Sequence, residues 1–211
     1  MTKSRSKQGG AVLGLLLLLG LTGCVGKSGV PLEGALPPDV DYAYIPLKRP
    51  STLLPENDAG AVVLGDGVAV TAAHAAHMLP VALLIGSAHE YDLAFFHTDR
   101  DKAALAQAEP RLGAKVVAYA HYGPVLYKAE GKITALNALV LPFCEGCVEQ
   151  KAFVFEGNAG PGYSGGPVIE VDSGKLIGIL FGYRDLDNGT RLLYAYPMDR
   201  VREELKKIQA K

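Results

Sequence analysis

The sequence predicts an all-β fold of antiparallel strands with one helix at the C-terminus. Short apolar runs alternate with turns rich in Gly, Asp and Asn, a pattern that is typical of strands joined in hairpins. Three such turns lie at residues 65–67, 172–174 and 187–189. Hairpins that follow one another favour a sandwich or a barrel over a fold in which helices alternate with strands.

The individual strands follow from these runs. Each run combines β-branched, aromatic or other apolar residues with a turn signal nearby. The expected strands are residues 61–64, 68–71, 81–85, 93–97, 115–120, 132–140, 152–156, 167–171, 176–182 and 191–196. Residues 103–109 form either a weak helix or a linker between two halves of the fold.

The C-terminal stretch has a helical period instead. Met198, Val201, Leu205 and Ile208 are spaced so that they lie on one face of a helix over residues 198–210. Acidic residues in its first half and lysines in its last turns complement the helix dipole.

Composition places the chain among ordinary globular proteins. Of its 211 residues, 49% are hydrophobic and 20% are charged, and the formal net charge is −1. A nucleic-acid partner is therefore not expected, because it would require a basic face. The length suits one domain or two small units that share a core, and no cofactor is implied.

The N-terminus has the pattern of an export signal. Lys3, Arg5 and Lys7 form a positive region, and residues 11–21 form an uncharged apolar run. This run is too short to span a bilayer as a helix but suits the core of a signal peptide.

The end of this run resembles the lipobox of bacterial lipoproteins. Leu21-Thr22-Gly23 precede Cys24, and this resemblance implies cleavage after residue 23 and acylation of the new N-terminal Cys24. The alternative is an ordinary signal peptide that is cut nearby and leaves Cys24 free. Residues 24–42, rich in Gly and Pro, are expected to form the acylated Cys and a flexible tether. We expect a lipid-anchored protein of the bacterial cell envelope, on the outer membrane facing the periplasm if the host has two membranes.

Two further cysteines, Cys144 and Cys147, are close in sequence. In an exported protein this spacing predicts a small structural disulfide, ahead of free thiols and then of a redox pair. A zinc site is not expected, because no second pair of ligands accompanies them.

The strongest local motif runs from Gly162 to Pro167 and reads Gly-Tyr-Ser-Gly-Gly-Pro. Its glycines allow unusual backbone angles around Ser164, and backbone N–H groups in such a turn can stabilise an oxyanion. Gly-rich turns are common, so an ordinary turn before a strand is the alternative.

A histidine and an aspartate complete a possible catalytic set. Thr71-Ala72-Ala73 lead from a predicted strand to His74, whose type is the usual general base for a hydroxyl nucleophile. Asp92 precedes an apolar strand and could orient the imidazole. Alone, each is more often structural than catalytic.

The strings around these three residues, in the order His, Asp, Ser, resemble the signature regions of the trypsin-like serine peptidases. The closest resemblance is to the bacterial, zymogen-free branch that includes the high-temperature-requirement proteases, and it covers roughly residues 58–200. It implies two antiparallel barrels and a C-terminal helix, with His74 as base, Asp92 as orienting acid and Ser164 as nucleophile. It also implies that the N–H groups of Gly162 and Ser164 form the oxyanion hole.

The sequence departs from the family pattern in two places. Only 18 residues separate His74 from Asp92 (92 − 74), which implies a trimmed first barrel or another acid, with Asp99 or Asp101 as the fallback. Tyr163 stands where the family more often has Asp or Asn. His77 lies close to His74 but lacks the preceding string.

Substrate selection follows from the same resemblance. The floor of the specificity pocket is expected at Asn158, six residues before the serine (164 − 6), and it is neutral. Phe181 and Tyr183 are expected in the wall that faces the substrate, which suggests an apolar or partly blocked pocket.

The sequence therefore predicts a serine endopeptidase that acts on protein or peptide substrates, with a peptidase domain over residues 43–211. The first barrel is expected at 43–105 and the second at 106–197. A peptidase-fold binding or scaffold protein without turnover is the alternative, because fold does not fix function. An α/β-hydrolase is disfavoured, since its order is Ser, Asp, His and its strands alternate with helices.

Overall fold

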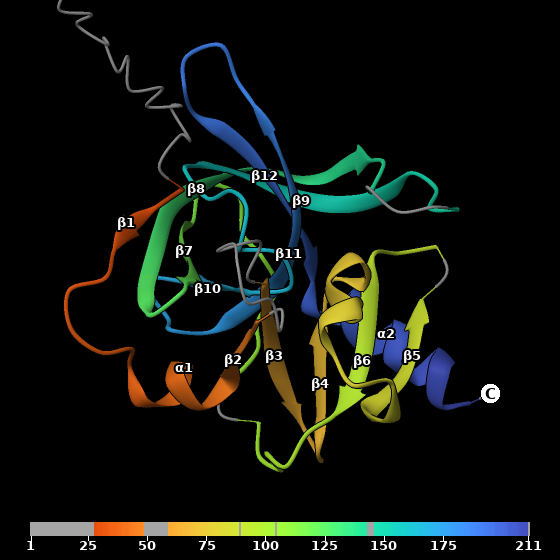
Figure 1. Ribbon diagram of the computed structural model, residues 1–211. Helices are drawn as coiled ribbons and strands as arrows, with labels where there is room; N and C mark the ends of the chain where they lie inside the picture. Colours follow the sequence, from red (N-terminus) through yellow and green to blue (C-terminus); the bar gives the residue numbers. More distant parts are fainter. Residues whose placement is uncertain (1–27, 49–58, 89, 104, 143–145, 211) are drawn as a thin grey trace, which may run out of the picture.

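The computed structural model describes residues 28–48, 59–88, 90–103, 105–142 and 146–210. The described residues form two antiparallel sheets and a C-terminal helix (Figure 1). The all-β fold class is therefore confirmed. Residues 1–23, Cys24 and Cys144 lie outside the described residues, so the signal peptide, the acylation and the disulfide stay predictions.

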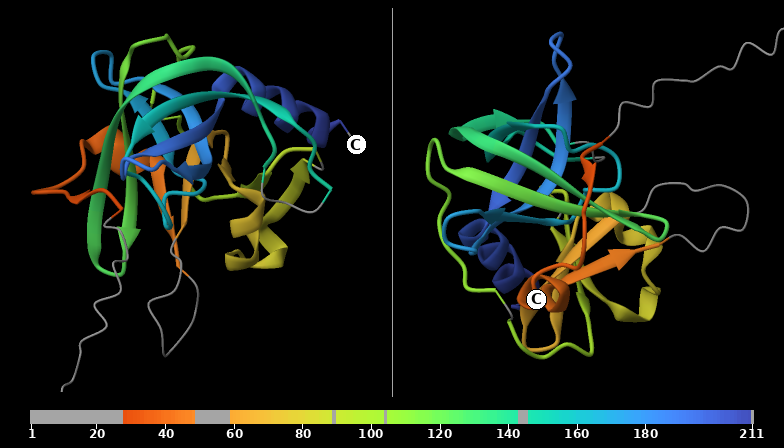
Figure 2. Two further views of the ribbon diagram at one scale, coloured as in Figure 1. Left: turned by 90° about the horizontal axis from the view of Figure 1, so that it is seen from above. Right: turned by 90° about the vertical axis from the view of Figure 1, so that its left-hand side faces the viewer.

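The larger sheet closes into a barrel. Its order is β1-β8-β7-β10-β11-β12-β9, and an additional pairing between β8 and β9 closes the ring of six strands while β1 lies beside β8. Figure 2 shows this barrel beside the smaller sheet. The strands are β1 (Val30–Pro31), β7 (Lys115–Tyr122), β8 (Val125–Val140), β9 (Gln150–Gly157), β10 (Pro167–Glu170), β11 (Leu176–Asp185) and β12 (Arg191–Pro197).

The smaller sheet is open within the described part of the chain. Its order is β2-β3-β4-β6-β5, with no pairing recorded between its edges β2 and β5. This is the trimmed first barrel that the short His–Asp spacing suggested. The strands are β2 (Tyr44–Leu47), β3 (Ala59–Gly65), β4 (Val68–Thr71), β5 (Leu84–Ala88) and β6 (Leu93–His97).

Two short 3-10 segments lie between β4 and β5. They are η1 (Ala73–Met78) and η2 (Val81–Leu83). The strand expected over residues 81–85 therefore begins only at Leu84. Val81 is 87% exposed, so its apolar side chain cannot contribute to the core that would hold a strand there.

The N-terminal segment differs from the expected flexible tether over residues 24–42. In its described part, β1 pairs with β8, and helix α1 (Pro38–Ala43) packs Val40 and Ala43 into the core. Residues 103–109 contain no helix in their described part. Instead, Gln107 forms a parallel bridge with Leu176, as a linker lying along the barrel.

Helix α2 (Met198–Gln209) packs against β5 at the edge of the smaller sheet and against β11 and β12 of the barrel. Its apolar face contributes Met198 and Val201 to the core. Gly86 of β5 approaches it closely, since a Cβ there would lie 2.8 Å from Ile208. The C-terminal helix thus crosses from the barrel to the smaller sheet and joins the two units.

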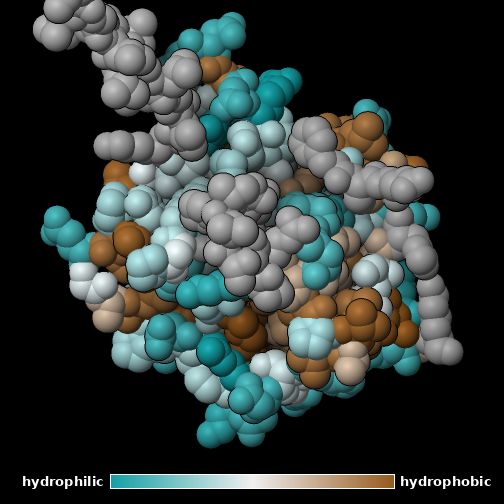
Figure 3. All heavy atoms as spheres, in the orientation of Figure 1, coloured by the Kyte–Doolittle hydropathy of each residue, from teal (hydrophilic) through white to brown (hydrophobic). Residues whose placement is uncertain are grey.

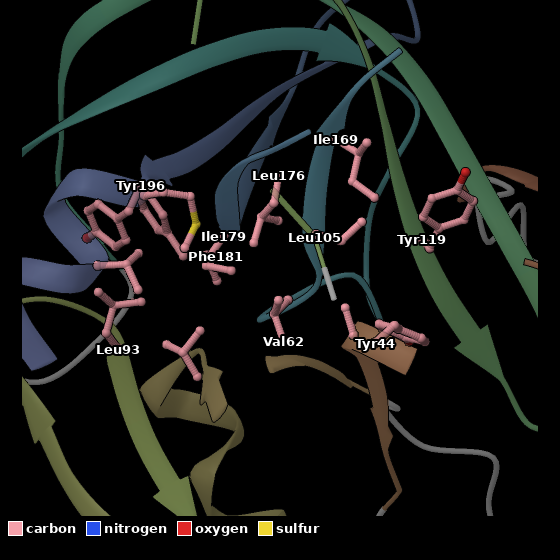
Figure 4. Close-up of a cluster of buried hydrophobic side chains, with 14 of the residues drawn as sticks. Tyr44, Val62, Leu93, Leu105, Tyr119, Ile169, Leu176, Ile179, Phe181 and Tyr196 are labelled. Carbon is pink, nitrogen blue, oxygen red and sulfur yellow. The ribbon is translucent and has the colours of Figure 1, made fainter. Parts of the chain in front are cut away.

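Alternate residues of the barrel strands face two different cores. In β7, Val116, Ala118 and Ala120 point into the barrel, whereas Val117 and Tyr119 face the smaller sheet. Figure 4 shows the second core, where Val62 and Leu93 of the smaller sheet meet barrel residues. These barrel residues are Tyr119, Ile169, Leu176, Ile179, Phe181 and Tyr196. Full burial of each such side chain contributes about 1.5–3 kcal/mol, so this shared core fixes the two units to each other.

The opposite face of the smaller sheet carries an apolar hollow of about 560 Å³. Ile45, Leu47, Leu79, Leu83 and Phe96 contribute its apolar lining. Figure 3 shows apolar side chains exposed over this part of the molecule. Among the described residues, no helix is both long and apolar enough to cross a membrane.

Candidate active site

His74 and Asp92 meet at one edge of the smaller sheet. β4 and β6 are antiparallel neighbours in which Thr71 pairs with Ala94, so the end of β4 and the start of β6 lie together. His74 follows β4 in the first turn of η1, and Asp92 directly precedes β6. The two residues are therefore brought together by strand pairing.

Asp92 is fully buried and binds His74 twice. One carboxylate oxygen accepts the backbone N–H of His74 at 2.8 Å, and the other lies 2.5 Å from the ring Nδ1. Because a carboxylate only accepts hydrogen bonds, this contact places the ring proton on Nδ1 and leaves Nε2 as an acceptor. The side chain of His74 is 38% exposed, so its outer edge is accessible.

The fallback acids lie elsewhere. Asp99 accepts a hydrogen bond from the Thr98 hydroxyl at 3.4 Å, and Asp101 accepts one from the Tyr42 hydroxyl at the same distance. His77 bonds through Nδ1 to the carbonyl oxygen of His74. Of the candidates, Asp92 is the acid that the structure pairs with His74.

Ser164 is the second residue of the second of two consecutive tight turns, which share Tyr163. Tyr163 N–H donates to the carbonyl of Gly160, and Gly166 N–H donates to the carbonyl of Tyr163. Gly162 and Gly165 occupy the third positions of these turns with φ of +90° and +77°. Pro followed by Gly in the first turn is the sequence that favours positive φ at that position.

The backbone N–H groups of Gly162 and Ser164 donate to no other residue in the described part of the chain, whereas Tyr163 N–H is used within its turn. Two unoccupied donors two residues apart, beside a serine hydroxyl, are what an oxyanion-binding site needs. Gly162 lies against the ring of Tyr122, which a Cβ at this position would approach to 3.1 Å.

Residues 159–166, here called the serine loop, form hydrogen bonds with both sheets. Gly60 N–H of β3 donates to the Ser164 carbonyl at 2.8 Å, and Gly165 N–H donates to the Leu180 carbonyl of β11 at 2.7 Å. The buried Thr71 hydroxyl donates to the Gly60 carbonyl at 2.7 Å. A Cβ at Gly165 would lie 2.2 Å from the Gly60 oxygen, so only glycine fits where the loop crosses the smaller sheet.

A cavity of about 540 Å³ joins the candidate residues. Its lining consists of His74, Ser164, Phe181, Gly182 and Tyr183. The predicted wall residues Phe181 and Tyr183 are therefore beside the candidate catalytic pair.

Asn158 is not brought to this cavity. It is exposed and lines a separate hollow with Val30 and Lys128. Its carbonyl accepts the N–H of Gly29 at 2.8 Å. The expected pocket floor thus contacts the N-terminal segment instead of the candidate active site.

Sequence reasoning missed the residues that support the serine loop from behind. Both residues, Ser28 and Arg191, are far away in the chain: the Ser28 carbonyl accepts the Tyr163 hydroxyl, and Arg191 donates to the Ala159 carbonyl. No local motif marks either residue. The one available signal was Tyr163 itself, a large aromatic residue before the serine, which needs partners to bury it. In the structure its side chain is fully buried.

The described residues contain no group of three or more His, Cys, Asp or Glu side chains that could hold a metal ion. The candidate site is thus built from a hydroxyl, an imidazole, a carboxylate and backbone amides. This set can perform nucleophilic acyl transfer.

Comparisons with known proteins identify the fold. No protein-family model and no curated protein matches the chain in sequence. An inactive-form variant of Rv3671c from M. tuberculosis H37Rv matches with a TM-score of 0.63 and 17% identity, over 86% of this chain and 98% of that chain. The MamO protease domain from Magnetospirillum magneticum matches with a TM-score of 0.61 and 15% identity, over 78% and 96%.

A third similar structure is a variant of the HtrA-type protease AlgW with a tripeptide. Its TM-score is 0.61 and its identity 19%, over 79% of this chain and 59% of that chain. At such identities the likeness concerns the fold. The chain therefore has the chymotrypsin-like fold of the trypsin-like and HtrA-type serine proteases.

Proposed function

We propose that this chain is a serine endopeptidase in which Ser164 is the nucleophile, His74 its general base and Asp92 the acid that orients His74. The observation that carries the proposal is the cavity shared by Ser164 and His74, with His74 held from behind by a fully buried Asp92. Each part has the chemistry its role requires.

The reaction follows from these roles. His74 Nε2 takes the proton of Ser164 as Oγ attacks the carbonyl carbon of a peptide bond. The N–H groups of Gly162 and Ser164 stabilise the negative oxygen of the tetrahedral intermediate. His74 then protonates the leaving amine, and water activated by the same imidazole hydrolyses the acyl-enzyme.

Substrates are expected to be proteins or peptides with an apolar or uncharged side chain beside the cleaved bond. Phe181 and Tyr183 give the cavity an aromatic wall, and none of the described residues that line it is acidic. Strong selection for Lys or Arg would require a carboxylate in the pocket. We assign no substrate contact to Asn158.

The direct test is labelling of the purified protein with a fluorophosphonate probe, which forms a bond with an activated serine. We expect labelling of the wild type at Ser164 and none of Ser164→Ala. His74→Ala should lower the labelling rate by about 10⁴-fold or more. A folded wild type that is never labelled would overturn the proposal.

One observation favours a second candidate, a peptidase-fold binding or scaffold protein without turnover. Although both residues are described, no hydrogen bond joins His74 Nε2 to the hydroxyl of Ser164. Catalytic hydrogen bonds are often long before substrate binds, so the endopeptidase is the better supported function. The same probe separates the two, because an idle site leaves the wild type as unreactive as Ser164→Ala.

We further propose that acylated Cys24 anchors the mature protein to a bacterial membrane, the outer one if the host has two. Ser28 is buried in the fold and follows Cys24 by four residues (28 − 24), which span at most about 14 Å. The anchor would therefore hold the folded domain close to the bilayer. A Cys24→Ser variant that stays in the membrane fraction like the wild type would overturn the anchor.

An exported location also favours a disulfide between Cys144 and Cys147. Mass spectrometry of the non-reduced protein should find a linked peptide that contains both residues. Alkylation of both thiols without reduction would contradict the proposal.

A further inference from the structure

The first described residues of the chain contact the serine loop directly. The buried Ser28 accepts the Tyr163 hydroxyl on its backbone carbonyl at 3.4 Å. Gly29 N–H donates to the Asn158 carbonyl at 2.8 Å, just before the loop. Val30 then pairs with Lys128 of β8, which fixes the segment to the barrel.

Arg191 of β12 connects the same segment to Ala159, at the start of the serine loop, and to Tyr183 in the cavity wall. One guanidinium nitrogen donates to the Ser28 hydroxyl at 3.0 Å and to the Ala159 carbonyl at 3.1 Å. The guanidinium carbon lies 4.7 Å from the ring centre of Tyr183, in the cavity wall. Asp185 accepts the Nε–H at 2.7 Å and balances the charge.

The packing at this contact leaves no free space. A Cβ at Gly29 would lie 2.0 Å from the Tyr163 hydroxyl oxygen and 2.6 Å from the Lys128 carbonyl oxygen. A Cβ at Gly160 would lie 2.1 Å from the Arg191 guanidinium and 2.3 Å from the Ser28 hydroxyl. The serine loop therefore cannot move toward the N-terminal segment, and the segment cannot move toward the loop.

Tyr163 connects this packing to the candidate oxyanion site. Its ring is fully buried, and burial raises the pKa of its hydroxyl. Its backbone lies between Gly162 and Ser164, whose N–H groups donate to no residue in the described part of the chain. The peptide group that joins Tyr163 to Ser164 carries the Ser164 N–H, so a shift of the Tyr163 backbone would move this donor directly.

We propose that residues 28–31, here called the brace, hold the serine loop in the conformation that binds the oxyanion. Tyr163 and Arg191 are the positioning residues through which the brace acts. The contact uses an internal, uncharged piece of backbone, so it is compatible with an acyl group on a residue upstream. The structural part of the proposal stands alone, whereas its catalytic consequence rests on the proposed function.

Two glycines of the N-terminal segment provide a matched test in the full-length protein. Gly29 and Gly34 both have positive φ, +76° and +92°, so alanine strains the backbone at each. Only Gly29 contacts the loop, because a Cβ at Gly34 would have nothing within 4 Å. The difference between Gly29→Ala and Gly34→Ala thus separates the steric overlap with Tyr163 and with the Lys128 carbonyl from the backbone strain.

Hydrogen exchange of a peptic fragment covering residues 160–167 is the readout that does not depend on activity. Gly29→Ala should raise exchange there by about tenfold or more, because steric overlap lowers the local stability that protects these amides. Gly34→Ala should leave it at the wild-type rate. Equal exchange in the two variants would overturn the brace.

The catalytic consequence is measured on the same proteins. Fluorophosphonate labelling of Gly29→Ala should slow by at least about tenfold, since the loss of one oxyanion donor costs on the order of 10²–10³ in rate. A wild type that is not labelled disproves the proposed function, while the exchange result still decides on the brace. If Gly29→Ala fails to fold, Ser28→Ala replaces it. This variant should raise hydrogen exchange over residues 160–167 and slow labelling, each by a smaller factor than expected for Gly29→Ala. Wild-type exchange in Ser28→Ala would then overturn the brace.

Discussion

Replacement of Asp92 by asparagine tests the proposed catalytic set most sharply. The carboxylate accepts two hydrogen bonds from His74, from the backbone N–H at 2.8 Å and from the ring Nδ1 at 2.5 Å. An amide offers one oxygen and one NH₂ group in the same space. Asp92→Asn can therefore accept only one of these two hydrogen bonds.

The two orientations of the amide have different consequences for His74. If its oxygen keeps the backbone N–H of His74, its NH₂ faces Nδ1, so the ring proton moves to Nε2, which can no longer accept the Ser164 proton. If its oxygen keeps Nδ1–H, its NH₂ opposes the backbone N–H, and this buried unsatisfied donor costs about 1–3 kcal/mol. The first orientation avoids that cost, so the inactive tautomer should dominate.

The expected loss in rate is about 10⁴-fold, or about 5.4 kcal/mol of transition-state stabilisation. The assay is the rate of fluorophosphonate labelling or of peptide cleavage, with the melting temperature measured in parallel. Asp99→Asn is the matched control, because Asp99 is exposed, accepts the Thr98 hydroxyl and makes no hydrogen bond with His74. A folded Asp92→Asn that reacts within tenfold of the wild type would refute the assignment of Asp92.

Three further changes test the surroundings of the site. Gly165→Ala should lower the unfolding free energy by several kcal/mol and slow labelling, because its Cβ would lie 2.2 Å from a backbone oxygen. The control is Gly174→Ala, which is also at positive φ but whose Cβ would have nothing within 4 Å. It should lower the unfolding free energy, measured by denaturant titration, by only about 1–2 kcal/mol. Hydrogen bonds from a serine hydroxyl and then from an arginine lower the pKa of the buried Glu170, so the stability it contributes is present above about pH 4.3 and is lost as the pH falls further. Glu170→Gln should therefore lose about 1–3 kcal/mol at pH 7 but less on acidification, as melting temperatures across pH would show. Tyr183→Ala should change the cleavage preference in a peptide-library digest, and Asn158→Ala should leave it unchanged.

Most strands of both sheets could be predicted from the sequence, because their pattern is local. β4, β6 and β9 are short apolar runs whose turn signals stand beside them. α2 was equally visible from its helical period. The strand expected at 81–85 was wrong in its first half, since apolar residues alone do not show whether a neighbouring strand is present to bury them.

The brace could not be predicted, because its partners are far away in sequence. Ser28 lies 135 residues from Tyr163 and 163 residues from Arg191. The Gly- and Pro-rich composition around it has no period, and such composition is typical of linkers. What fixes the segment is a surface of the barrel that exists only after β8 and β12 have formed.

The assignment of Asn158 shows why counting along a chain is a weak guide near this loop. Six residues before Ser164 is the expected position of a pocket floor, yet there the Asn158 carbonyl accepts Gly29 N–H. The brace and Arg191 fill the space behind the loop instead. Among the described residues, Phe181, Gly182 and Tyr183 line the cavity beside Ser164 and His74.

The short spacing between His74 and Asp92 is explained by the order of the strands in the smaller sheet. Two full strands between these residues would be needed only if β4 and β6 were separated in the sheet. Here they are neighbours, with Val70 opposite Phe95, and β5 lies outside them on the edge. The 18 residues hold two 3-10 segments and one edge strand, enough to return the chain to the end at which it left. The trimmed first barrel therefore keeps the two hydrogen bonds between Asp92 and His74, provided that β4 and β6 keep their register. Loss of activity in a variant that shifts this register, with Asp92 intact, is the expectation that follows.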